Sequence, residues 1–127
     1  MLQKVTENEL PSAQKGQVRI KALSTSASFT DTLIRRGIYP AVRKKPPFSP
    51  GYDVIGVVDA LGEGVQNLSI GQKVADLTII GAYSEYMCLD ANSVVTVPDN
   101  LDHAEALSMI LTYQTAYQMI YLALIHI

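Results

Sequence analysis

Short β-branched segments, closely spaced and separated by Gly, Pro, Asn and Asp, constrain the fold of this chain most. The clearest lies within residues 50–65, where a Pro-Gly turn precedes an apolar segment that Gly56 interrupts and that Gly62 and Gly64 end. A glycine inside a strand indicates a bulge or a close backbone approach. Strands this short and this close favour a small barrel or sandwich over repeated strand–helix units, so we expect a mainly β fold.

The remaining strands follow from alternation and from β-branched content. Val18, Ile20 and Ala22 alternate with charged residues, which predicts a strand with one buried face over residues 17–23. Further strands are expected within residues 73–77, 81–89 and 94–97. Loops are expected at residues 24–28 and, because of their four prolines, at residues 39–50.

Two helices are predicted from their capping residues. The first is short, begins after Ser28 or Thr30, and is ended by Gly37. The second begins at Asn100 or Asp102 and carries an acidic residue in its first turn, near the positive end of the helix dipole.

Composition excludes several classes of protein. A length of 127 residues suits one domain with a real core, and 48% hydrophobic against 17% charged residues excludes a disordered chain. The formal net charge of −2 gives no reason to expect nucleic acid as a partner. Cys88 is the single cysteine, so no internal disulfide is possible and a reducing compartment, the cytoplasm, is expected.

The C-terminal segment is apolar without being an obvious membrane span. Residues 106–127 contain no Asp, Glu, Lys or Arg, and a segment of this length is long enough to cross a bilayer. Thr112, Gln114 and Gln118 interrupt it, however, and no basic flank follows. A helix buried against protein is therefore favoured over a membrane span.

Several stretches together resemble the medium-chain dehydrogenase/reductase superfamily, in its zinc-free quinone oxidoreductase-like branch. They stand in the family's order, near its spacing, over almost the whole chain: Thr30-Asp31-x-x-x-Arg35-x-Gly37-x-Tyr39-Pro40, Pro50-Gly51-Tyr52-Asp53-x-x-Gly56-x-Val58-x-x-x-Gly62, Gly71-x-x-Val74, Gly81-Ala82-Tyr83-x-Glu85-Tyr86, Val97-Pro98 and Thr115-Ala116-Tyr117-Gln118. The resemblance implies that residues 1–99 form a catalytic domain with a GroES-like, partly open β-barrel fold. Residues 100–127 would be a helical segment leading into a Rossmann domain that holds NADPH.

The same resemblance argues against a metal. The ligand positions of the zinc-dependent members are occupied here by Ser28, Leu33 and Tyr52. A hydroxyl, an alkyl chain and a phenol do not make a tetrahedral zinc site, so no metal is expected.

Without a metal, hydride transfer depends on positioning and on hydrogen-bond donors. The phenols of Tyr39 and Tyr52 are the candidate catalytic groups, because a phenol donates to a developing enolate or hydroquinone oxygen; the alternative is that both are packing residues. Ser28 and Asp31 are candidates for the substrate pocket. Thr115 stands where the resemblance implies a contact with the nicotinamide ring, and helix packing is its alternative role.

Asp31 and Asp53 are expected to be buried or half-buried carboxylates. One interpretation is that they orient the pocket. The other, which we favour, is that they are partners for Arg35 or caps for backbone groups.

One expected part of the family's architecture is missing. No Gly-x-Gly-x-x-Gly motif occurs, so the pyrophosphate of a dinucleotide has no predicted site. Residues 124–126 look like the start of the first Rossmann strand, which indicates a truncated protein. We expect the substrate-side domain of an NAD(P)H-dependent oxidoreductase that reduces small quinones or enones, little active alone. The alternative is a non-enzymatic GroES-like module that binds a small ligand or forms a homo-oligomer through its C-terminal helix.

Overall fold

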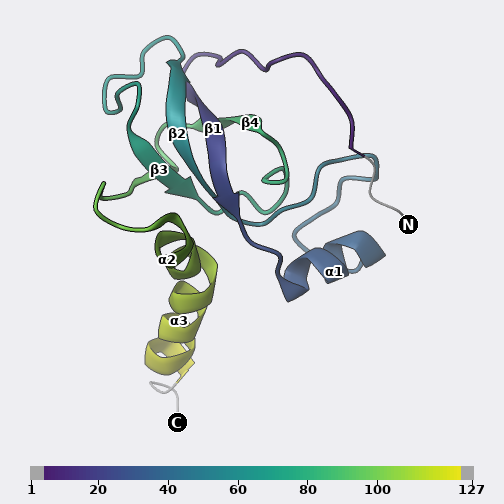
Figure 1. Cartoon of the computed structure of the whole chain (residues 1–127). Coiled ribbons are helices and arrows are strands. Elements are labelled where there is room, and N and C mark those ends of the chain that lie inside the picture. The colour runs from purple at the N-terminus through teal and green to yellow at the C-terminus, as the bar shows by residue number, and fades with distance from the viewer. Residues whose placement is uncertain (1–4, 124–127) are drawn as a thin grey trace.

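Residues 5–123 are described by the computed structural model, and the strand expected at residues 124–126 lies outside them. The core of the molecule is one five-stranded antiparallel sheet in the order β4-β1-β2-β3-β5. Figure 1 labels the first four of these strands, β4, β1, β2 and β3. Its strands are β1 (Gln17–Thr25), β2 (Val54–Leu61), β3 (Lys73–Asp76), β4 (Tyr86–Asp90) and β5 (Val95–Thr96). The sheet is not closed, and the mainly β, partly open GroES-like fold is confirmed.

The central pair of strands, β1 and β2, carries the features that the sequence predicted for Gly56. The register of β1 against β2 shifts between Ala22 and Ser24, opposite Gly56 and Ile55. A Cβ at Gly56 would lie 2.7 Å from the carbonyl oxygen of Lys21, so the expected bulge and the close backbone approach are both found.

Strand β1 is longer than predicted. Ser24 and Thr25 were expected to lie in a loop, but they pair with Ile55 and Val54 of β2. Strand β4 is shorter than predicted, because residues 81–85 approach the sheet without joining it as a strand.

Alternation along the strands sorts the buried residues onto two faces of the sheet. One face holds the larger cluster, made of Val18, Ile20, Val54, Val58, Leu68, Val74, Ala82, Leu89 and Ala91. The other face is smaller, and there Ile55 and Ala75 pack against Ala106 and Leu107 of α2 (His103–Ser108). This second cluster attaches α2 to the sheet.

Helix α1 (Phe29–Arg36) begins and ends where its capping residues predicted. Ser28 is the N-cap, and its backbone N–H donates to the carboxylate of Asp31 at 2.8 Å. Gly37 ends the helix in the left-handed conformation, with φ 72°, and its N–H donates to the carbonyl oxygen of Ile34.

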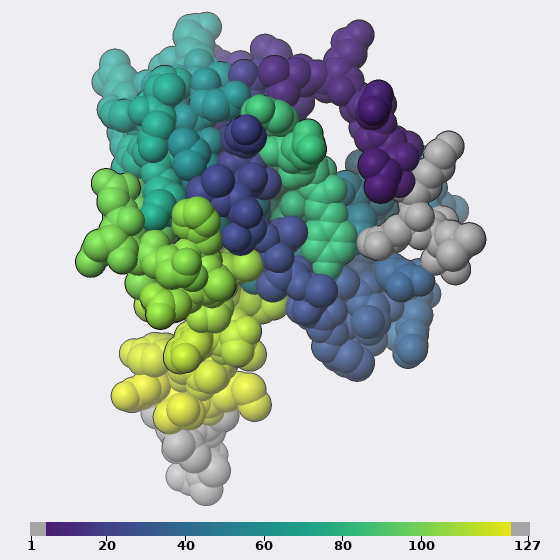
Figure 2. Space-filling view, in the orientation of Figure 1, coloured from purple at the N-terminus to yellow at the C-terminus, as the bar shows by residue number. Residues whose placement is uncertain are grey.

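The C-terminal helical segment has three parts. Asp102 caps α2, as one of the two predicted starts, by accepting from the N–H groups of Ala104 and Glu105. A π-helical turn, η1 (Met109–Tyr113), which the sequence did not predict, follows and leads into α3 (Gln114–Ala123). Figures 1 and 2 show α3 projecting away from the sheet. Its side chains are mostly exposed, so the expected burial is found for α2 and not for α3.

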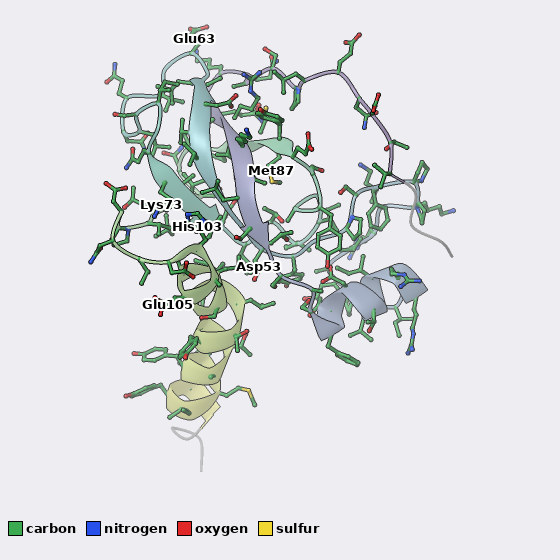
Figure 3. The ribbon with its side chains drawn as sticks, viewed as in Figure 1. Asp53, Glu63, Lys73, Met87, His103 and Glu105 are labelled. Atoms are coloured by element: carbon green, nitrogen blue, oxygen red, sulfur yellow. The ribbon has the colours of Figure 1, made fainter. Side chains whose placement is uncertain are left out.

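Lys73 ties the sheet to the start of this segment. Its ammonium donates to the carbonyl oxygens of Asp99 and Leu101, both at 3.1 Å, and Figure 3 shows Lys73 and His103 where β3 approaches α2. Within residues 5–123, no helix is both long and apolar enough to cross a bilayer. The division of the chain after residue 99 stays a prediction.

Candidate functional site

The two predicted catalytic phenols lie together. Tyr39 follows the end of α1 and Tyr52 precedes β2, and their hydroxyl oxygens are 2.7 Å apart. The ring centroids are 5.9 Å apart with an interplanar angle of 79°, an edge-to-face arrangement. Tyr52 is 9% exposed. Tyr39 is half-buried, so it is the more accessible member of this phenol pair.

The phenol pair has one proton to offer a third group. Each hydroxyl carries one O–H donor and also accepts. The bond between the two oxygens uses one of the two protons, and either residue can be its donor. The second O–H therefore remains as a donor for a ligand oxygen.

The environment keeps Tyr52 neutral. Burial, followed by the hydrogen bond with Tyr39, raises the pKa of Tyr52 from 10.0 to about 12. A neutral phenol at physiological pH is a hydrogen-bond donor and not a base.

This pKa predicts how stability depends on alkaline pH. The pKa of Tyr52 in the folded state lies above its value in the unfolded state. The contribution of Tyr52 to the free energy of unfolding is therefore fully present below about pH 10 and is lost as pH rises toward about 12. Denaturant titrations at pH 8 and pH 11 measure how much free energy of unfolding is lost between the two pH values. This loss is expected to be smaller for Tyr52→Phe than for the wild type. Tyr117→Phe, on the exposed face of α3, is the control and should lose as much as the wild type. Equal losses in all three proteins would contradict the assignment.

Asp31 connects α1 to the turn that precedes Tyr52. It is 6% exposed. One carboxylate oxygen accepts from the N–H and the hydroxyl of Ser28, at 2.8 Å and 3.1 Å, and the other accepts from the N–H of Gly51 at 3.2 Å. Ser28 and Asp31 are thus bonded to each other, and both are linked to Tyr52 through its neighbour in the chain.

Asp53 is buried, as expected, and holds the loop after β1. It is 1% exposed, and its Oδ1 accepts from the hydroxyl of Ser26 at 2.7 Å and from the N–H of Ser26 at 3.1 Å. Figure 3 shows Asp53 near the end of the sheet that lies toward the helices. These bonds are those of a backbone cap, the interpretation that we favoured.

Sequence reasoning missed Tyr83. Its hydroxyl lies 3.3 Å from a carboxylate oxygen of Asp31 and 3.3 Å from the carbonyl oxygen of Ser26. Burial and then the charge of Asp31 raise the pKa of Tyr83. The family-like Gly81-Ala82-Tyr83 stretch was a signal for the position, but nothing in the sequence indicated its partners.

Thr115 lies apart from these residues. It is exposed on α3. None of the hydrogen bonds given above for Ser28, Asp31, Tyr39 and Tyr52 involves it. Its role toward a nicotinamide ring stays a prediction.

Tyr83 also lines a groove in the described part of the chain. An open, shallow groove of about 320 Å³ is lined by Ala22, Leu23, Ser24, Thr25, Ala82, Tyr83, Ser84 and Glu85. Among residues 5–123, no group of three His, Cys, Asp or Glu side chains is placed to hold a metal ion. All strand pairs of the described sheet are antiparallel, so these residues form no parallel strand–helix–strand unit with a glycine-rich turn for a dinucleotide pyrophosphate, and they do not fit NADPH by themselves.

The chain is similar to known oxidoreductases over most of its length. The family profile "Alcohol dehydrogenase GroES-like domain" matches residues 14–99. Human quinone oxidoreductase is 34% identical over 120 residues, which are 92% of this chain and 34% of that protein. The mouse synaptic vesicle membrane protein VAT-1 homolog-like is 28% identical over 118 residues, 93% of this chain and 28% of that protein.

Solved structures show the same fold. The human VAT-1 homolog-like protein superposes with a TM-score of 0.82 at 29% identity, covering 90% of this chain and 37% of that one. The quinone oxidoreductase of Thermus thermophilus, also solved in complex with NADPH, gives 0.78 at 27% identity, covering 92% and 36%. This chain thus spans about a third of the length of these relatives. It belongs to the alcohol dehydrogenase GroES-like domain family, in the quinone oxidoreductase-like branch of the medium-chain dehydrogenase/reductase superfamily.

Proposed function

We propose that this chain is the substrate-side domain of an NAD(P)H-dependent oxidoreductase that reduces a quinone or an enone. The observation that carries the proposal is the phenol pair, with its oxygens 2.7 Å apart and one O–H left to donate. Reduction of a conjugated carbonyl places negative charge on its oxygen, and a positioned donor stabilises that charge.

The two phenols have different roles in this proposal. Tyr39 is the more accessible, so its O–H donates to the carbonyl oxygen of the substrate. Tyr52 is buried and donates to Tyr39, which strengthens Tyr39 as a donor because linked hydrogen bonds polarise one another. Ser28 and Asp31, which hydrogen-bond to each other beside the turn that carries Tyr52, are assigned to the substrate side of the phenol pair in this proposal.

The cofactor is assigned to a part of a longer protein. NADPH would supply the hydride, and the relatives that share this fold are about three times longer than this chain. Thr115 is the residue of this chain proposed to approach the nicotinamide ring. The 127 residues alone are therefore expected to bind substrate without turning it over.

Substrate binding can be measured on the chain itself. With tyrosine labelled at Cζ with ¹³C, titration with 2-cyclohexen-1-one or duroquinone should shift the signals of Tyr39 and Tyr52 saturably. Tyr39→Phe should weaken binding about tenfold, the value of one hydrogen bond to a developing or partial charge. Tyr113→Phe, 64% exposed on the helical segment, is the control and should bind as the wild type does. Unchanged Tyr39 and Tyr52 signals at saturating probe, or NADPH oxidation by the chain alone, would contradict the proposal.

A second candidate function is supported by α3. Tyr117, Met119, Ile120 and Leu122 are 56–66% exposed, and the helix carries no charged residue. An apolar surface of this kind marks an interface, so the chain would be a module that self-associates through α3. Sedimentation equilibrium of the wild type and of Met119→Lys tests self-association through α3. A monomeric wild type rejects self-association. A wild-type dimer that dissociates in Met119→Lys supports it.

A further inference from the structure

The two phenols reach each other from separate segments of the chain. Tyr39 is carried by the residues after α1, and Tyr52 by the turn before β2. Their hydrogen bond therefore requires α1 and this turn to be fixed relative to each other. Asp31 supplies one link, because it belongs to α1 and accepts from the N–H of Gly51.

Tyr83 holds the turn from its other side. Its N–H donates to the carbonyl oxygen of Pro50 at 2.9 Å, and its own carbonyl oxygen accepts from the hydroxyl of Ser49 at 3.0 Å. A Cβ at Gly51 would lie 2.6 Å from the backbone nitrogen of Tyr83 and 2.7 Å from its Cδ1. The turn is in direct van der Waals contact with both the backbone and the ring of Tyr83.

The hydroxyl of Tyr83 contacts Asp31, the residue that links α1 to the turn. It lies 3.3 Å from the Oδ2 of Asp31, the oxygen that also accepts from Ser28. The backbone and ring of Tyr83 thus contact the turn that carries Tyr52, while its hydroxyl contacts the helix that leads to Tyr39.

The backbone before Tyr83 is strained where it meets Tyr52. Ile79 has φ 67°, a conformation that β-branched residues rarely adopt, and the N–H of Ile80 donates to the carbonyl oxygen of Thr78 to close a three-residue turn. The N–H of Ile79 donates to the carbonyl oxygen of Tyr52 at 3.1 Å. Strain of this kind persists where the surrounding structure imposes it. Here it accompanies a direct bond to a residue of the phenol pair.

We propose that Tyr83 is a positioning residue, which sets the geometry of the Tyr39–Tyr52 pair by bonding to Asp31 and by packing against Gly51. The proposal rests on the function proposed above for the pair. The single proton of the Tyr83 hydroxyl is shared between Asp31 and the carbonyl oxygen of Ser26, both at 3.3 Å. Without this hydroxyl, Asp31 loses a shared donor and α1 can move relative to the turn. The O–H of Tyr39 then points less well at a carbonyl oxygen.

The test is a double-mutant cycle of Tyr83→Phe and Tyr39→Phe, read as the affinity for 2-cyclohexen-1-one. Tyr83→Phe keeps the ring against Gly51 and removes only the hydroxyl. It should weaken binding about fivefold in the wild-type background and have no effect in the Tyr39→Phe background, because residues that act through one interaction are not additive. Equal effects in both backgrounds would overturn the proposal.

A second readout does not depend on a ligand. In the ¹³Cζ spectrum, Tyr83→Phe should lower the titration midpoint of Tyr52 from about 12 toward the ordinary value of 10.0, because a loosened pair is less buried and less well bonded. An unchanged midpoint would reject the positioning role, even if Tyr83→Phe were less stable. If the wild type fails to bind the enone while the midpoint still falls, the proposed function is wrong and the positioning of the pair by Tyr83 stands.

Discussion

Replacing Gly62 by alanine is expected to lower the free energy of unfolding by about 3 kcal/mol or more. Gly62 ends β2 against the turn that leads into β1, and its N–H donates to the carbonyl oxygen of Gln17 at 2.8 Å. A Cβ there would overlap the carbonyl oxygen of Gln14 and would lie 2.8 Å from that of Gln17. Both neighbours are backbone atoms, so no side-chain rotation relieves the clash.

Gly64→Ala is the matched control for Gly62→Ala. Gly64 lies two positions further on, has φ 84° and has no atom within 4 Å of an added Cβ. Its substitution meets only the cost of the left-handed conformation, about 1 kcal/mol. Urea denaturation followed by circular dichroism gives both values, and similar losses in the two variants would show that the turn moves aside to accommodate the methyl group.

Gly51→Ala is expected to have the second-largest effect, about 3 kcal/mol, and to separate the two phenols as well. The residue has φ 104°, and an added Cβ would lie within 2.8 Å of Ala82 and closer still to Tyr83. Moving the turn away from residues 82–83 shifts Tyr52, the next residue along the chain. The hydrogen bond to Tyr39 should therefore be lost.

Gly81 offers a control with almost the same φ. Its φ is 105°, but the nearest atom to an added Cβ is the methyl carbon of Met87 at 3.5 Å, an ordinary contact. Gly81→Ala thus measures the conformational cost alone. The difference between the two variants in urea denaturation is the energy of the close approach, and the ¹³Cζ signals of Tyr39 and Tyr52 should change only in Gly51→Ala. A change in both variants, or in neither, would contradict the explanation.

Local sequence patterns predicted which helices and strands form, and were less successful at predicting where they end. Val18 and Ile20 alternate with charged residues and marked β1, but its last residues, Ser24 and Thr25, are small and polar and carry no such signal. They join the strand only because β2 lies beside them. The caps of α1 and α2 were predictable because a cap is a contact between residues two to four apart.

In the candidate site too, contacts between residues near in sequence were predictable and contacts between distant residues were not. The bond between Ser28 and Asp31 is local, and the spacing of a capping box indicates it. The contact of Tyr83 with Asp31 joins positions 52 apart, and no property of either residue specifies the other. Tyr39 and Tyr52 were chosen by family resemblance, and their separation of 2.7 Å became visible only in the fold.

The C-terminal helices show a third case. The apolar, uncharged composition of residues 106–127 predicted a helix buried against protein, since an apolar helix face normally packs against something. The packing partner has to exist in the folded molecule. In the described residues Ala106 and Leu107 of α2, with Ile110 of η1, pack against the sheet, whereas the side chains of residues 114–122 in α3 are exposed. The π-helical turn between α2 and α3 has no distinctive composition, so nothing in its residues distinguishes it from an ordinary α-helical turn.

The two hydrogen bonds of Lys73 give this arrangement a mechanical consequence. Together with the cluster of Ile55, Ala75, Ala106 and Leu107, they fix the pivot of a helical arm that runs from His103 to Ala123, about 30 Å at the rise of a helix. A tilt of about 10° at the pivot moves the far end by about 5 Å, since displacement grows in proportion to the arm. Small changes in the packing beneath α2 would therefore displace the exposed side chains of α3 much further than they displace α2 itself.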